Sequence, residues 1–128
     1  MGIRSEPKFF MQLNVAPAAN NNNPVPMDFV MVLDKKLIKD MAKLSAKDWF
    51  DRRVQIQRDY PNLTEIVSWE WVPGQHTGTI SIEVNPKAQG AFLFANYLTP
   101  GDNRAAVDVH VPVVVNLLEE GFTVQPLK

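Results

Sequence analysis

The sequence predicts a mainly β protein, a two-sheet antiparallel β-sandwich of about seven or eight strands with a short helical insert. Short runs of alternating apolar and polar residues recur along the chain, separated by turn residues at the spacing typical of sandwiches. One stretch, at about residues 35–59, changes to helical spacing. The length of 128 residues suits one hydrophobic core, so we expect residues 1–128 to form a single domain.

The first two predicted strands flank a long polar loop. Residues 9–15 alternate apolar and polar side chains, and residues 27–33 do so again. Residues 16–26, between them, hold three prolines and four asparagines, which disfavour both a helix and a central strand. We therefore expect a loop from Pro17 to Pro26 that is longer than a hairpin needs and stands free of the sandwich.

The helical insert has recognisable end signals. Its apolar side chains recur at helical spacing, at Leu37, Met41 and Leu44. Ser45 stands three residues before Asp48, as in a capping box. Tyr60 precedes a proline and so avoids the helical region, which ends the insert. These signals predict one or two short helices over residues 35–59.

The remaining segments alternate again and predict further strands. These are residues 67–71, 79–84, 92–97, 107–111, 113–118 and 122–126. Residues 79–84 show the cleanest alternation, with Ile80, Ile82 and Val84 expected to point inward. Residues 92–97 are apolar on both faces, which is typical of a central strand. In this interpretation His110 lies on the polar face of its strand.

Charge is unevenly distributed along the chain. Residues 35–58 carry eight basic and three acidic side chains, a balance of +5, whereas residues 59–128 sum to −5. The insert either presents a basic face to an acidic partner or a phospholipid surface, or it is a solvated face balanced by its own domain. Its apolar positions do not form the wide stripe of a membrane-inserting helix. The overall net charge of −1 gives no argument for nucleic acid binding.

Residue chemistry nominates no catalytic, metal or cofactor site. The absence of cysteine excludes disulfides, thiol catalysis and cysteine-based zinc sites. The two histidines do not have metal-binding spacing, and no nucleophile elbow, P-loop or dinucleotide motif is present. We expect no enzyme, no metal and no cofactor. Three tryptophans, Trp49, Trp69 and Trp71, raise the alternative of glycan stacking, although core packing is the favoured interpretation.

The order of elements resembles the TssJ family of outer-membrane lipoproteins of type VI secretion systems. The resemblance rests on short segments in sequence order: Phe9–Val15, Asn20–Asn23 followed by Pro24-Val25-Pro26, Asp48-Trp49-Phe50, Val72-Pro73-Gly74-Gln75, and Phe92–Tyr97 followed by Arg104. It implies a transthyretin-like fold of two four-stranded sheets with a helical insert. It also implies a non-catalytic component of the secretion membrane complex on the periplasmic face of the outer membrane.

The resemblance further implies the partner and the site. TssJ proteins bind the periplasmic C-terminal region of the inner-membrane protein TssM, partly through the loop that joins the first two strands. In this sequence the candidate partner-binding residues are Asn20, Asn21, Asn22, Asn23 and Pro24. Asparagine offers hydrogen-bond donors and acceptors without charge, and flanking prolines lower the entropy lost when a loop is ordered.

One departure from the family concerns the lipid anchor. TssJ proteins are acylated on an N-terminal cysteine, and this sequence contains none. We expect the leader and its cysteine to have been removed or replaced by Met1-Gly2. Two alternatives stay open at this point: a β-sandwich module that binds a ligand or glycan or assists an adhesin, and a cytoplasmic adaptor, which rests only on the missing leader.

Overall fold

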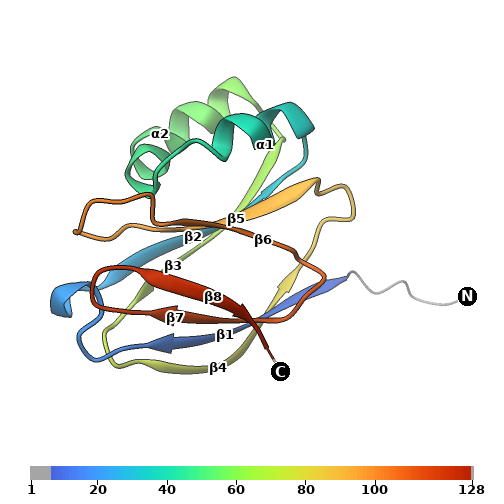
Figure 1. Ribbon diagram of the computed structural model, residues 1–128. Helices are drawn as coiled ribbons and strands as arrows, with labels where there is room; N and C mark the ends of the chain where they lie inside the picture. The colour runs from blue at the N-terminus through green and yellow to red at the C-terminus, as the bar shows by residue number, and fades with distance from the viewer. Residues whose placement is uncertain (1–6, 128) are drawn as a thin grey trace, which may run out of the picture.

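The computed structural model describes residues 7–127, so the expectation about Met1-Gly2 lies outside the described residues. Two four-stranded sheets face each other, and two helices cover the outer face of one of them (Figure 1). The elements are β1 (Lys8–Val15), η1 (Ala19–Asn22), β2 (Val25–Val32), α1 (Lys35–Met41), α2 (Ala46–Asp59), β3 (Thr64–Trp71), β4 (His76–Glu83), β5 (Gly90–Ala95), β6 (Arg104–Val107), β7 (Val113–Leu117) and β8 (Phe122–Pro126). The predicted β-sandwich with a helical insert is confirmed.

Strand order distinguishes the two sheets. The β1 sheet has the order β4-β1-β7-β8, and the β2 sheet has the order β3-β2-β5-β6. Every pair is antiparallel except β1 and β7, which run parallel with Met11 opposite Val113. Both sheets are thus antiparallel-rich, as the predicted sandwich requires, and the β1–β7 pair makes the β1 sheet mixed. Alternating patterns reveal strands and their faces but do not tell which distant strands pair.

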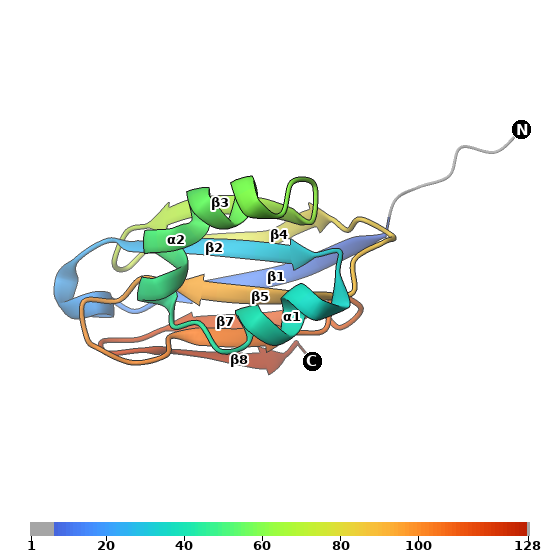
Figure 2. The ribbon, with the colours of Figure 1, turned by 90° about the horizontal axis from the view of Figure 1, so that it is seen from above.

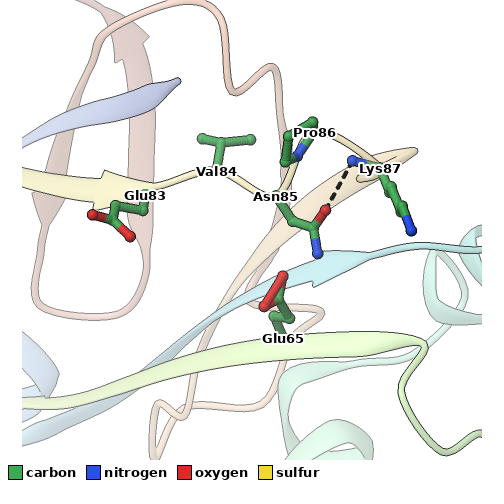
Figure 3. A pocket seen from close by; sticks show the side chains of 6 residues that line it. All are labelled: Glu65, Glu83, Val84, Asn85, Pro86 and Lys87. Carbon is green, nitrogen blue, oxygen red and sulfur yellow. Dashed lines mark hydrogen bonds between the residues drawn. The ribbon is translucent and has the colours of Figure 1, made fainter. Parts of the chain in front are cut away.

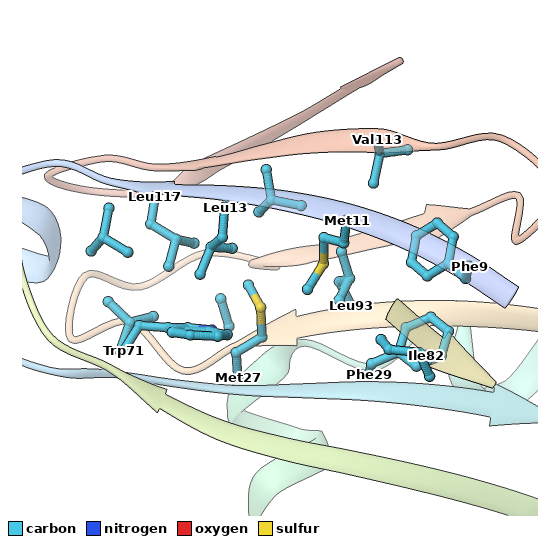
Figure 4. Packing of buried hydrophobic residues seen from close by; sticks show 14 of the residues in the cluster. Phe9, Met11, Leu13, Met27, Phe29, Trp71, Ile82, Leu93, Val113 and Leu117 are labelled. Atoms are coloured by element: carbon cyan, nitrogen blue, oxygen red, sulfur yellow. The ribbon is translucent and has the colours of Figure 1, made fainter. Parts of the chain in front are cut away.

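The main core lies between the two sheets (Figure 4). Alternate residues of β1 and β2 face each other there, and the rings of Phe9 and Phe29 stack with centroids 5.2 Å apart. Trp71 is 5% exposed and packs in this core, and Trp69 is partly buried beside it. The core interpretation of these two tryptophans is confirmed.

A second apolar layer joins the β2 sheet to the helices. The outer faces of β2 and β5 contribute Val30 and Phe94, and the helices contribute Met41 and the fully buried Trp49. The rings of Trp49 and Phe94 stack 5.3 Å apart. The two central strands are thus buried on both faces, which explains the absence of polar alternation along β5.

A buried carboxylate ties helix α2 to the β2 sheet. Asp28 is fully buried on the outer face of β2. Its Oδ2 accepts hydrogen bonds from Trp49 Nε1 and Arg53 Nη1, both at 2.8 Å, and its Oδ1 accepts one from Ser68 Oγ at 2.6 Å. Arg53 therefore serves the interior of the domain, although the sequence presents it as one of the surplus positive charges of the insert.

The insert begins and ends where the sequence predicts. Its two helices occupy residues 35–41 and 46–59, inside the predicted 35–59 range. Ser45 Oγ accepts a hydrogen bond from the N–H of Asp48 at 3.1 Å, which satisfies one of the free donors at the helix start. Tyr60 terminates α2 as expected.

Several strand boundaries differ from the prediction; for example, β3 begins at Thr64 rather than 67, and β5 at Gly90 rather than 92. β2 begins at Val25 rather than 27, with Pro26 near the strand start, where a missing N–H is tolerated. β4 begins at His76, ahead of the predicted 79. The predicted strand over 107–111 is wrong beyond Val107, because Asp108 Oδ1 accepts from the N–H of His110 at 2.9 Å and forms a turn. His110 lies in that turn, not on a strand face.

The sandwich has two distinct ends. Both described chain ends lie toward one end, which we call the terminal pole, and Figure 2 shows it on the right. There the N–H of Val84 donates to the carbonyl of Pro7, and the N–H of Leu127 donates to the carbonyl of Pro112. Helix α1 starts at this same end, directly after β2. The opposite end holds the loop between β1 and β2.

Candidate functional site

Four connections meet at the end opposite the chain termini. We call this end the loop pole; it comprises residues 16–24, 72–75, 96–103 and 118–121, seen on the left of Figures 1 and 2. The carbonyl of Ala16 accepts from the N–H of Gly74 at 3.1 Å, and the N–H of Asn20 donates to the carbonyl of Leu118 at 3.2 Å. The expectation of a loop standing free is therefore wrong, because backbone hydrogen bonds fasten it to its neighbours.

The asparagine run adopts a backbone conformation that few residues accept. Asn20, Asn21 and Asn22 have φ values of 50°, 52° and 66°, all in the left-handed region. Among residues with a side chain, asparagine tolerates this region best. The turn closes with a hydrogen bond from the N–H of Asn23 to the carbonyl of Asn20 at 3.0 Å. The predicted free-standing loop thus contains a tight left-handed turn.

Asn20 has a structural position within this turn. It is 2% exposed, its Nδ2 donates to the carbonyl of Pro24 at 2.9 Å, and its Oδ1 accepts from the N–H of Leu98 at 2.8 Å. Its side chain joins the β1–β2 loop to the β5–β6 loop and is not available to a partner. The other candidate residues, Asn21, Asn22, Asn23 and Pro24, are exposed.

Exposed apolar side chains accompany the asparagines, and sequence reasoning missed them. Leu98 is 67% exposed, Val72 57% and Leu118 45%. Leu98 and Leu118 belong to the two loops that hydrogen-bond Asn20. Apolar residues beside turn signals, such as Leu98 before Thr99-Pro100, could have indicated this surface. Apolar side chains next to uncharged amides are the chemistry of a protein–protein interface.

A tyrosine is buried beneath this surface. Tyr97 is 7% exposed, and its hydroxyl has no hydrogen-bond partner among the described residues. Burial raises the pKa of Tyr97 to about 12 from the ordinary value of 10.0, and the nearby backbone of Leu118 opposes this rise without bonding the hydroxyl. The folded loop pole therefore favours the neutral phenol.

The Tyr97 pKa predicts a loss of stability at high pH. Because the folded pKa lies above the unfolded one, this contribution is complete below pH 10 and is lost as the pH rises from about 10 to about 12. Tyr97→Phe removes the titrating group, so urea-unfolding midpoints of the variant should exceed those of the wild type increasingly above pH 10. A constant difference between pH 8 and pH 11.5 would contradict this prediction.

The terminal pole contains an open groove of about 460 Å³ (Figure 3). Glu65 and Glu83 line it from different strands, and the N–H of Lys87 donates to Asn85 Oδ1 at 2.9 Å. Among residues 7–127 no group of three histidine or acidic side chains could hold a metal ion. Within the same residues no helix combines the length and hydropathy needed to span a membrane.

Comparisons with known proteins give structural matches only. No protein-family model and no curated protein matches the sequence. The T6SS lipoprotein TssJ1 from Pseudomonas aeruginosa is similar in structure, with a TM-score of 0.75, 14% identity, and coverage of 97% of this chain and 98% of that chain. Serratia marcescens Lip, a membrane-bound component of the type VI secretion system, gives a TM-score of 0.66, 12% identity, and coverage of 94% and 97%. A chain in the structure of the T6SS protein TssM C-terminal domain from EAEC gives a TM-score of 0.66 and 12% identity. The match covers 94% of this chain and 98% of that chain.

These matches agree with the resemblance seen in the sequence. They extend over nearly the whole chain, so the fold expected from TssJ lipoproteins is confirmed. The proteins that share it are components of type VI secretion systems. At 14% identity or less, the likeness establishes the fold, and function is a separate step.

Proposed function

We propose that this chain, which has the fold of TssJ lipoproteins, is a non-catalytic structural component of a type VI secretion membrane complex. It docks the periplasmic C-terminal region of a TssM-like inner-membrane protein through its loop pole. It sits at the periplasmic face of the outer membrane, held by an N-terminal lipid anchor. The observation that carries the proposal is the match of 97% of the chain to a T6SS lipoprotein at a TM-score of 0.75.

The arrangement of the two poles supports this orientation. The described chain begins at the terminal pole, so a tether attached ahead of Pro7 leaves the loop pole free to meet a partner. Hydrogen bonds between the loops hold the exposed asparagines and leucines in one arrangement before binding. Such preorganisation reduces the entropy lost on association.

The burial of the tryptophans argues against the glycan-binding alternative. That alternative depended on tryptophans exposed for stacking, but Trp49 and Trp71 are buried and Trp69 is partly covered. No arrangement of side chains at the loop pole favours a sugar over a protein partner. We therefore pursue the docking function alone.

The docking function predicts that the exposed leucines contribute directly to affinity. Leu98→Ala combined with Leu118→Ala should weaken binding of the cognate TssM C-terminal region about tenfold or more, because the variant loses the apolar side-chain area that docking removes from water. The matched control is Val54→Ala on helix α2, which removes an apolar side chain of similar exposure, 58%, outside the loop pole. Isothermal titration calorimetry measures all three affinities.

The same titration tests the exposed asparagines. Asn21→Gly and Asn22→Gly together remove two exposed amides, while glycine retains access to positive φ. Asn23 is kept because its Nδ2 donates to the carbonyls of Asn20 and Asn21 at 3.1 and 3.0 Å. We expect weaker TssM binding with a melting temperature close to that of the wild type. If both loop-pole variants bind as tightly as the wild type, docking through this pole is disproved.

A further inference from the structure

We propose that the solvent face of helix α1 and of the turn after it rests on an anionic phospholipid surface. The contact face consists of four lysines, Lys35, Lys36, Lys39 and Lys43, which we call the lysine row. The inference extends the proposed function, which places the domain beside a membrane, and it concerns a face separate from the loop pole.

The lysine row forms one continuous face. Within α1, a rotation of about 100° per residue places Lys35, Lys36 and Lys39 within an arc of about 100°, on the side opposite Leu37 and Met41, and Lys43 follows in the turn after the helix. Leu37 and Met41 are buried against the β2 sheet, so the lysines point away from it. All four lysines are exposed. The helical insert thus presents a flat strip of positive charge on the outside of the sandwich.

The row is not neutralised within the domain. Among the described residues, none of the four lysines lies within ion-pair distance of a carboxylate, whereas Lys47 on α2 pairs with Asp51 at 3.3 Å. Asp40 is the single acidic residue in the segment 35–43. The interpretation in which the insert is balanced by its own domain therefore holds for Arg53 and Lys47 but not for this row.

The chemistry of the row suits lipid headgroups better than a protein partner. The cores of protein interfaces are depleted in lysine and enriched in aromatic residues. Segment 35–43 has no exposed bulky apolar side chain, because Leu37 and Met41 face inward. Clusters of lysine next to a membrane are attracted to anionic lipids without inserting into the bilayer. The contact is therefore peripheral and weakens with salt.

The position of α1 makes both contacts possible at once. Helix α1 begins at the terminal pole, directly after β2, and the loop pole lies at the far end of the sandwich (Figure 2). In a domain tethered ahead of Pro7, the lysine row can contact the bilayer while the loop pole remains accessible to a partner. The lysine row then restricts the orientation of the domain on the membrane more than an N-terminal tether alone does.

Vesicle sedimentation tests the proposal. The purified chain is mixed with vesicles of phosphatidylethanolamine and phosphatidylglycerol, or of phosphatidylcholine alone, at about 0.1 M and about 1 M salt. We expect partitioning onto the phosphatidylglycerol vesicles at the lower salt only. Lys35→Gln, Lys36→Gln, Lys39→Gln and Lys43→Gln together should reduce the partition coefficient about tenfold or more. Glutamine forms helix nearly as well as lysine, and circular dichroism verifies the fold.

A matched control changes the net charge equally on another face. Thr79→Glu, Ser81→Glu, Thr123→Glu and Gln125→Glu place four negative charges at exposed positions of β4 and β8, in the sheet that has no helical cover. This variant should keep most of the vesicle binding. Equal loss in both variants, or binding that ignores phosphatidylglycerol, overturns the proposal. So does a lysine-row variant that weakens TssM binding but not vesicle binding, since the row would then serve the protein partner. The proposed docking function is tested separately, by the titration of the loop-pole variants with the TssM C-terminal region.

Discussion

Arg53→Met is expected to lower the free energy of unfolding by about 3 kcal/mol. The change removes the charged partner of Asp28, whose side chain is 1% exposed, and leaves a buried carboxylate with only two neutral donors. Breaking a buried ion pair from one side typically costs about 3–5 kcal/mol. The lower end applies here because the Arg53 side chain is itself 37% exposed and water can reach part of the vacated position. Urea denaturation monitored by tryptophan fluorescence gives the value.

A double variant separates the charge from the packing. Asp28→Asn combined with Arg53→Met leaves no charge in the layer, and an asparagine at position 28 can accept from Trp49 Nε1 and donate to Ser68 Oγ. We expect this variant to lie within about 1 kcal/mol of the wild type, as replacing both members of a buried pair often does. If the double variant is less stable than Arg53→Met alone, the uncompensated charge is not the cause of the loss.

Asn20→Ala is expected to have the second large effect, a loss of about 3 kcal/mol in the free energy of unfolding. Alanine leaves the carbonyl of Pro24 and the N–H of Leu98 without their partners, at about 1–3 kcal/mol for each group that stays buried. Alanine also lacks the polar side chain that lets asparagine tolerate a φ of 50°, which adds about 1 kcal/mol to the loss of folding free energy. Because this side chain joins two loops of the proposed docking surface, TssM affinity should fall as well.

Asn21→Ala is the matched control for that loss. Its φ of 52° is nearly the same as that of Asn20, but Asn21 is exposed and its side chain makes no hydrogen bond with the described residues. Its cost should therefore be about 1 kcal/mol, the backbone contribution alone. Chemical denaturation of both variants compares the two costs, and equal losses would show that the Asn20 side chain contributes nothing.

The elements that the sequence predicted well are those with local signals. The bounds of the helical insert follow from Ser45, Tyr60 and a helical period, all of which act within one or two turns. The central position of β5 follows from its two apolar faces. The parallel pairing of β1 with β7 has no local signal, because it joins strands that are about a hundred residues apart. Pairing at that distance depends on the whole fold.

The conformation of the candidate partner-binding loop could not be predicted in detail from the sequence. Four consecutive asparagines look equivalent in sequence. In the fold, the loops that contain Leu98 and Leu118 hydrogen-bond to Asn20 and bury it, while the other three asparagines are exposed. The burial of Asp28 could not be predicted from the sequence for a similar reason. An acidic residue between Met27 and Phe29 resembles the solvent face of a strand until helix α2 covers that face. Burial of both residues depends on distant segments that periodicity does not reveal.

The parallel contact between β1 and β7 also governs when the chain can fold. β1 occupies an inner position of its sheet, between β4 and β7, yet it is the first strand to be synthesised. The backbone groups on one edge of β1 have no strand partner until residues 113–117 have been made, so almost the entire polypeptide must be complete before this sheet closes. Pairing between strands so distant in sequence is expected to slow folding relative to a sheet built from neighbouring strands.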